Sequence, residues 1–154
     1  MNIVPFSSEY SSVVRSFVID VLSGEGFDYD SLKDSDLDDI PGNYSKKGGA
    51  FFLCLVNGNI VGTSAVKYLD TGTCEIKRLY VRKDCRGRGI GFSLFLKALE
   101  YAETHFSQVK LKTDSSLEKA ISIYKENGFS LVNEENGTVY FEKSSDNGNN
   151  TGKE

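Results

Sequence analysis

The stretch that decides the fold is Glu75-Ile76-Lys77-Arg78-Leu79-Tyr80-Val81, followed four residues later by Arg86-Gly87-Arg88-Gly89-Ile90-Gly91. The first part alternates polar and apolar side chains, which is typical of a strand with one buried face. The second part is glycine-rich and directly precedes a stripe of apolar residues at helical spacing that begins at Phe92. The sequence therefore predicts a strand, a glycine-rich turn and a helix in immediate succession.

Such a turn is suited to an anion. Glycines bring several backbone N–H groups together, and the helix N-terminus adds unpaired donors and the positive end of its dipole. Residues 67–88 also hold seven basic side chains against three acidic ones, and two of the bases, Arg86 and Arg88, lie in the turn itself. A Walker P-loop would have a lysine in place of Phe92, and a Rossmann fingerprint would have a glycine there, within a parallel βαβ unit. Both readings fit poorly, so the residues alone leave two interpretations open, a purely structural turn and a site for another kind of anion.

The segments around this stretch predict further elements. Residues 51–56 and 60–68 are β-rich runs joined by Asn57-Gly58-Asn59, and with 74–81 they predict three adjacent antiparallel strands. A first strand over 2–6, a helix that Ser7 or Ser8 begins, and a short helix around 31–39 are expected before them. After the turn come a long helix, a strand over 108–113, a helix ended by Asn127-Gly128, and a hairpin of residues 129–132 and 138–142.

Length and composition set the outer limits. With 154 residues, 39% of them hydrophobic, the chain suits a single domain over residues 1–143, followed by a polar tail, 144–154, that we expect to be disordered. No apolar run approaches the roughly 20 residues of a membrane helix, and the start lacks the pattern of a signal peptide, so we expect a cytoplasmic protein without a membrane partner. The three cysteines do not have the spacing of metal ligands, so no metal site is predicted. A pI near 5.1 argues against a nucleic-acid partner, because proteins that bind nucleic acid usually have a basic surface.

Two motifs carry a family resemblance. Arg86-x-x-Gly89-x-Gly91 after its strand resembles the acetyl-CoA signature of the GCN5-related N-acetyltransferases, and Ala120-Ile121-Ser122-Ile123-Tyr124-Lys125-Glu126-Asn127-Gly128-Phe129 is similar to that family's second landmark. The resemblance implies an α/β (α+β) fold, with a mixed, mostly antiparallel sheet of six or seven strands and helices on both faces. It also implies transfer of an acetyl group from acetyl-CoA to a primary amine, with a homodimer unsurprising. A non-catalytic acyl-CoA-binding module and a regulator that binds another nucleotide remain alternatives.

The resemblance further assigns roles by position. Main-chain groups of Leu79, Tyr80 and Val81 would pair with the pantetheine arm, and the Leu79 N–H would hold the thioester oxyanion. The pyrophosphate would lie on the turn and the start of the helix, formed by Arg86, Gly87, Arg88, Gly89, Ile90, Gly91 and Phe92.

Two side chains are candidates for proton transfer. Tyr124 matches the family's tyrosine that protonates the departing thiolate, and Glu75 resembles the general base of some branches. The alternatives are a core tyrosine and a glutamate that only pairs with a neighbouring cation. One departure concerns Leu117, which occupies a position where many members have an asparagine that contacts CoA.

The remaining signal is a run of acids. Residues 20–39 hold eight acidic side chains against the single base Lys33. A charge run is usually a solvated surface, but beside an acetyl-CoA site it suggests an acceptor pocket. We therefore expect residues 28–39 to favour a cationic amine.

Overall fold

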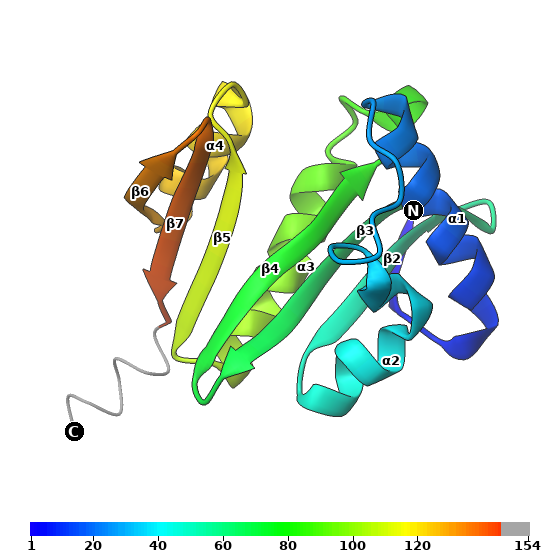
Figure 1. Cartoon of the computed structure of the whole chain (residues 1–154), viewed down its shortest axis with the longest axis horizontal. Coiled ribbons are helices and arrows are strands. Elements are labelled where there is room, and N and C mark those ends of the chain that lie inside the picture. Colours follow the sequence, from blue (N-terminus) through cyan, green and yellow to red (C-terminus); the bar gives the residue numbers. More distant parts are fainter. Residues whose placement is uncertain (146–154) are drawn as a thin grey trace.

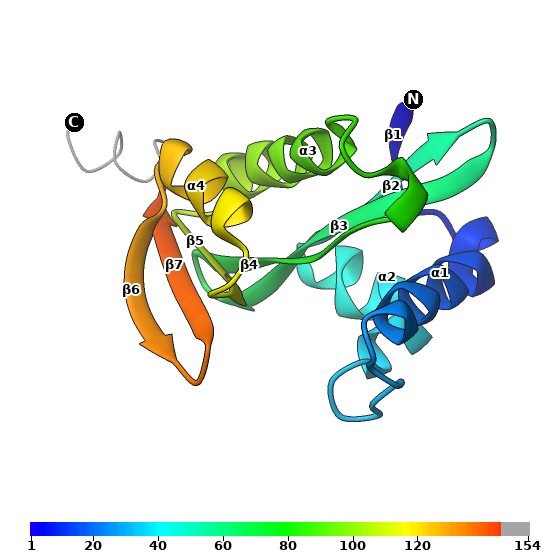
Figure 2. The same cartoon turned by 90° about the horizontal axis from the view of Figure 1, so that it is seen from above.

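The computed structural model describes residues 1–145, which form one seven-stranded sheet with helices on both faces (Figures 1 and 2). The strands lie in the order β1-β2-β3-β4-β5-β7-β6, and β4 and β5 are the only parallel neighbours of this sheet. The predicted mixed, mostly antiparallel sheet is therefore confirmed. Its strands are β1 (Asn2–Pro5), β2 (Ala50–Val56), β3 (Asn59–Asp70), β4 (Thr73–Val81), β5 (Gln108–Asp114), β6 (Ser130–Glu135) and β7 (Thr138–Ser144).

The three central antiparallel strands follow from local turn chemistry. Asn57 and Gly58 both have positive φ, 52° and 79°, which is the backbone of a two-residue hairpin turn and matches the twist of the strands beside it. This turn joins β2 to β3, and Gly72, at φ 86°, helps to close the next hairpin between β3 and β4. The hairpin predicted at Asn57-Gly58-Asn59 and the three adjacent antiparallel strands are confirmed.

Two layers of helices cover the sheet. Figure 2 shows α3 (Ile90–His105) and α4 (Glu118–Glu126) on one face, and α1 (Ser11–Gly24) and α2 (Ile40–Asn43) on the other. The α3–α4 face buries Phe95, Leu99, Tyr124, Phe129 and Phe141 in one cluster. The α1–α2 face buries a second cluster around Val14, Val18, Tyr44 and Leu53. Four 3₁₀ turns complete the described elements: η1 (Ser8–Tyr10), η2 (Ser35–Asp38), η3 (Ser45–Lys47) and η4 (Lys83–Cys85).

The structure corrects two boundaries. The short helix expected around 31–39 is instead the turn η2 followed by α2, which begins at Ile40 because the Asp39 carboxylate accepts the Gly42 N–H. The folded part also extends past 143, since β7 ends at Ser144 and Ser145 is fully buried, with its hydroxyl donating to the Phe106 carbonyl at 2.7 Å. The rest of the predicted tail, 146–154, lies outside the described residues. Within residues 1–145, no helix is long and apolar enough to cross a bilayer.

Candidate active site

The site begins where two parallel strands separate. Strand β4 pairs with β5 only from Thr73 to Glu75, opposite Gln108 to Lys110. Beyond Glu75, β4 continues against β3 while β5 continues against β7, so among the described strands none pairs with the β5 side of β4 there. An unpaired strand edge offers N–H and C=O groups to any extended, amide-bearing ligand. The separation of β4 from β5 is visible in Figure 1.

A cavity of about 690 Å³ lies at this separation. Its wall includes the predicted residues of β4 (Leu79, Tyr80, Val81), the start of α3 (Gly91, Phe92), the turn residue Arg86, and Tyr124 of α4. The resemblance assigned all of these to one site, and the fold brings them together. Two further wall residues, Leu117 and Lys119, precede or lie on α4. Leu117 is half exposed, makes no side-chain cap for α4, and adds an apolar surface where the family often has an amide.

The glycine-rich turn adjoins this cavity through a smaller one of about 250 Å³. Gly87 and Gly89 have φ values of 82° and 81°, so the chain reaches the first turn of α3 in a left-handed conformation that other residues rarely adopt. Gly89 is the N-cap of α3 and supplies no side chain to cover the first N–H groups. Residues Arg86, Gly87, Ile90 and Lys119 also line the small cavity. The arrangement is that of an open helix N-terminus with cations beside it, which favours a phosphate.

The arginines of the turn are anchored in different ways. Arg86 donates from Nε to the Val81 carbonyl at 3.0 Å, which holds its guanidinium at the join of the two cavities. Arg88 is exposed, and it donates from Nη2 to the Asp84 carbonyl over a long distance of 3.4 Å. The sequence did not predict that Lys119 lies at this site, because a single lysine on α4 has no recognisable pattern and comes close to the turn only in the folded protein.

Strand β4 carries a bulge at the separation. Lys77 lies opposite Ala65 and Tyr80 opposite Thr63, so Arg78 and Leu79 together face only one residue of β3. Arg78 has φ 54°, an unfavourable value for an arginine, and its carbonyl accepts the Thr63 hydroxyl at 2.7 Å. The bulge turns Leu79 toward the α3 side, where its side chain packs against two clusters. Leu79 therefore lies on the stretch of β4 beyond Glu75, which pairs with no described strand on its β5 side.

The side chain of Arg78 holds the bulge in place. Its guanidinium bonds Asp36 through Nε at 3.1 Å and Nη2 at 2.5 Å, and it bonds Asp34 through Nη2 at 3.1 Å. Tyr44 donates its hydroxyl to Asp36 at 2.5 Å, and all these side chains are buried. Burial works against ionisation of Asp36, but the hydrogen bonds from Arg78 and Tyr44 outweigh it and keep the pKa of this carboxyl below its usual value. The loop before α2 is thereby fixed to β4.

These contacts change the meaning of the acidic run. Asp34 and Asp36 are bound to Arg78, Asp38 pairs with Arg15 at 2.8 Å, and Asp39 caps α2. Asp30 also accepts the backbone N–H groups of Leu32 and Lys33, so five of the eight acids in residues 20–39 have partners within the chain. Net charge along the sequence could not reveal this, because Arg78 lies more than forty residues away from its partners. Asp20, Glu25 and Asp28 make no such contact among residues 1–145, and Glu25 lines the large cavity, so the expected preference for a cationic amine stays a prediction that rests on fewer free carboxylates.

Tyr124 is the buried acid of the cavity. Its ring contacts Phe95 with centroids 5.2 Å apart and also meets Phe129 and Phe141. Its hydroxyl makes no hydrogen bond to any of residues 1–145, although the residue lines the large cavity. Burial raises the pKa of this phenol, so the proton stays on the oxygen at neutral pH. Tyr124 is therefore both a core tyrosine and a free proton donor.

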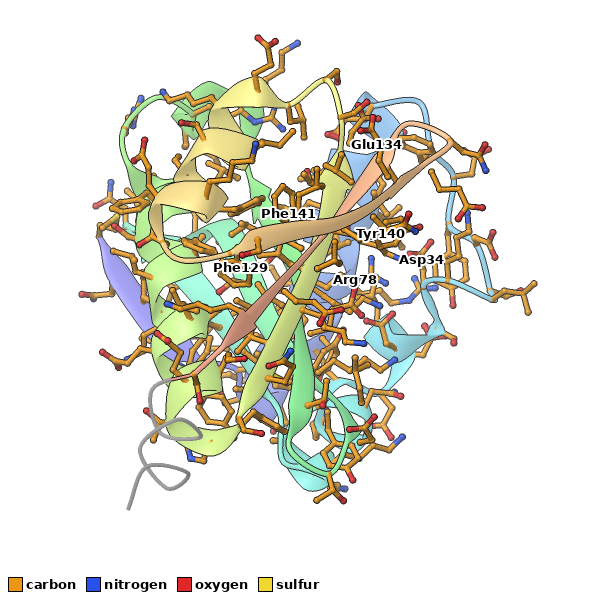
Figure 3. All side chains as sticks on the ribbon, turned by 90° about the vertical axis from the view of Figure 1, so that its left-hand side faces the viewer. Asp34, Arg78, Phe129, Glu134, Tyr140 and Phe141 are labelled. Atoms are coloured by element: carbon orange, nitrogen blue, oxygen red, sulfur yellow. The ribbon has the colours of Figure 1, made fainter. Side chains whose placement is uncertain are left out.

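Glu75 lies on the opposite face of the sheet. It is the last residue of β4 paired with β5, opposite Lys110, and it faces Lys67 of β3. It lines a third cavity, of about 310 Å³, together with Lys110, Lys112 and Tyr140. Figure 3 shows Phe129 and Phe141 toward α3 and α4, and Tyr140, Arg78 and Asp34 on the other side of the strands. Glu75 and Tyr124 thus flank the separated strands from opposite faces.

Comparison with known proteins agrees with this geometry. Residues 17–129 match the family described as the acetyltransferase (GNAT) family. An uncharacterized N-acetyltransferase of Escherichia coli strain K12, YjgM, is 30% identical over 106 residues, which cover 66% of this chain and 64% of that protein. This chain therefore spans just under two thirds of that relative's length.

Solved structures share the fold over nearly the whole chain. An acetyltransferase of the GNAT family from Staphylococcus aureus Mu50 superimposes with a TM-score of 0.79 at 25% identity, covering 93% of this chain and 98% of that one. The PaiA N-acetyltransferase of Thermoplasma acidophilum, solved in complex with coenzyme A, gives a TM-score of 0.68 at 17% identity and covers 94% and 99%.

Proposed function

Because this chain belongs to the acetyltransferase (GNAT) family, we propose that it transfers an acetyl group from acetyl-CoA directly to the amino group of an acceptor. The observation that carries the proposal is the cavity of about 690 Å³ between β4 and β5, whose wall includes both the open start of α3 and the unbonded hydroxyl of Tyr124. One end of this cavity suits a pyrophosphate and the other suits a reacting thioester. The cytoplasmic location and the homodimer stay predictions from the sequence.

Different residues of the site suit the pyrophosphate and the pantetheine arm of acetyl-CoA. The pyrophosphate lies on the first N–H groups of α3 and the turn from Arg86 to Gly91, with Lys119 as a further cation. The pantetheine arm has two amides, and it pairs as a short strand with the free edge of β4 at Leu79, Tyr80 and Val81. Phe92 and Leu117 give the apolar wall that the arm's methylene groups need.

The chemistry is a direct acyl transfer. The amine nitrogen attacks the thioester carbon, a C–N bond forms, and the carbonyl oxygen becomes an oxyanion that the Leu79 N–H stabilises. Collapse of this intermediate breaks the C–S bond, and the thiolate takes the proton of the Tyr124 hydroxyl. The proton that the nitrogen sheds after attack restores the tyrosine through water. Tyr124 suits this role because burial keeps its phenol protonated until a thiolate forms beside it.

Glu75 is the candidate base. An alkyl amine is cationic near neutral pH and must lose one proton before it can attack. Glu75 lies beside the gap on the face away from Tyr124, so it meets an acceptor that approaches from that side, directly or through a water molecule. A structural role is the competing interpretation, because Lys67 and Lys110 are its neighbours on the adjoining strands.

The test joins a binding and a turnover measurement. Thermal shift against CoA, acetyl-CoA, ATP and NAD identifies the ligand, because a ligand that binds only the folded state raises the melting temperature. We expect CoA and acetyl-CoA to give the largest shifts. Release of free thiol from acetyl-CoA across a panel of amines then measures transfer. A larger shift with ATP or NAD would contradict the proposal, and binding without thiol release from any amine would favour a non-catalytic acyl-CoA module.

A further inference from the structure

The face of the sheet opposite Tyr124 has an excess of positive charge. Ile76, on β4, packs in the cluster under α3, so its neighbours Glu75 and Lys77 point to the other face. The side chains that share this face around the gap are Lys67 of β3, Lys110 and Lys112 of β5, Tyr140 of β7 and Glu142 of β7. Beside the gap, four ammonium groups thus meet two carboxylates, and two further acids, Asp114 and Glu135, follow farther along the same face. No helix covers the β5, β7 and β6 part of this face (Figure 2), so an acceptor can reach it.

Three of the four lysines on this face form no ion pair within residues 1–145. Lys110 approaches Glu142 to 3.9 Å, whereas Lys67, Lys77 and Lys112 make no ion pair within residues 1–145. Two further carboxylates on this side of the sheet, Asp34 and Asp36, are already bound to Arg78. The charge available to a ligand on this face is therefore positive, the reverse of what the acidic run suggested.

Lys77 is a cation that is partly buried and has no ion-pair partner within residues 1–145. It is partly buried between Glu75, Lys67 and Arg78 on the face beside the gap. Burial lowers the pKa of this ammonium; Glu75, the next largest influence, and Asp36 act against it, and the like charges of Lys67 and Arg78 lower it further. Glu75 and Asp36 attract the Lys77 ammonium, but neither forms an ion pair with it, so this partly buried group is left without the direct counter-charge that usually accompanies it. An anionic group of a ligand would supply this counter-charge.

The spacing of Glu75 and Lys77 fits a zwitterion. Two residues apart on one strand, they project from the same face with Cα atoms about 7 Å apart. They do not form an ion pair with each other. An amino group beside Glu75 and a carboxylate beside Lys77 would bridge them, with the amino group at the end where β4 and β5 part.

We propose that the acceptor is an amine that also carries a carboxylate, such as a free amino acid, and that Lys77 binds this carboxylate while Glu75 faces the amino group. Lys67 and Lys112 add to the positive potential of the same face. The inference rests on the proposed function, since it names the acceptor class of that same site. Lys77 is a specificity residue here, and it takes no part in breaking or forming a bond.

The experiment compares acceptors that differ only in the carboxylate. Glycine is measured against glycinamide, phenylalanine against phenylalaninamide, and lysine against cadaverine, with spermidine as a purely cationic amine. Amidation lowers the pKa of the neighbouring amine and so favours its free-base form, which makes a preference for the acid a stringent result. We expect at least one amino acid to exceed its carboxylate-free partner about tenfold or more in kcat/KM, the scale of one charge-assisted hydrogen bond.

Variants then assign the effect to Lys77. Lys77→Met should raise the KM for the amino acid about tenfold and abolish discrimination against the amide, while the KM for acetyl-CoA stays unchanged. Lys77→Arg keeps the positive charge and should retain part of the preference for the amino acid. The matched control is Lys125→Met, which removes an exposed lysine of α4 on the other face and should change neither KM.

Failure has two distinguishable forms. Equal or better turnover of spermidine, or of the amides, overturns the acceptor class and leaves the transferase standing, as does an equal loss for acid and amide in Lys77→Met. Absence of thiol release with every amine, while acetyl-CoA still raises the melting temperature, overturns the transferase and this inference with it.

Discussion

Removal of the Arg78 guanidinium should destabilise the fold far more than removal of a surface arginine. Arg78→Met keeps the length of the side chain but leaves Asp34 and Asp36 buried without their cation, with side chains only 9% and 7% exposed. Breaking a buried pair from one side costs about 3–5 kcal/mol, because the remaining charge stays desolvated. For a domain of this size, about 2–4 °C is lost for each kcal/mol, so the melting temperature should fall by about 6–20 °C.

The chain offers a matched control. Arg15 also makes a charged hydrogen bond to an aspartate, Asp38, at 2.8 Å, but these side chains are 44% and 50% exposed. Water screens such a pair and hydrates the partner left behind, so Arg15→Met should melt close to the wild type. Both variants are measured by circular dichroism or calorimetry at neutral pH and low salt. Equal losses in the two variants, or a loss of less than about 3 °C for Arg78→Met, would refute the argument that burial sets the size of the effect.

Three further predictions follow from the same geometry. Tyr124→Phe should reduce kcat about 100-fold or more while CoA affinity and melting temperature stay unchanged, because the hydroxyl bonds no described residue; a fall in affinity or stability would contradict this. Gly89→Ala and Gly58→Ala introduce the same backbone strain of about 1–2 kcal/mol, because the two glycines have φ values of 81° and 79°. Only Gly89→Ala should weaken CoA binding in titration calorimetry. Equal CoA affinities of the two variants would show that the turn does not bind CoA. Because the pKa of Asp36 is lowered in the folded protein, this group contributes stability that is complete above about pH 3.9 and is lost as the pH falls through the folded pKa. In Arg78→Met the carboxylate has no cation, so the free energy of unfolding should fall less on acidification than in the wild type. Parallel acid-unfolding curves for the two proteins would contradict the assignment.

Elements with a local cause were predictable from the sequence. The hairpin at Asn57-Gly58 depends on two adjacent residues that tolerate positive φ, and the end of α4 depends on Gly128 at φ 92°. The glycine-rich turn needed only its own residues and the strand and helix on either side of it. All three were located correctly because the physics that specifies them acts within a few residues.

Features with a distant cause were not predictable. Positive φ at Arg78 is unfavourable by its own chemistry, and it persists because Asp34, Asp36 and the Thr63 hydroxyl hold the residue from two other segments. The buried Ser145 belongs to the domain because its hydroxyl bonds the Phe106 carbonyl, a contact that a polar tail composition conceals. Lys119 lines the small cavity at the glycine-rich turn only because α4 lies beside that turn in the fold.

The charge pattern shows why composition misjudges specificity. A substrate responds to the charges that remain unpaired at the site, and pairing is decided by the tertiary fold. Arg78 takes two carboxylates out of the acidic run, and its neighbour Lys77 makes no ion pair within residues 1–145. The same three-residue network therefore weakens the argument for a purely cationic acceptor and supports the proposal of one that also carries a carboxylate. The sign of the preferred acceptor depends on which ion pairs form on folding, and a count of acids along the chain does not contain that information.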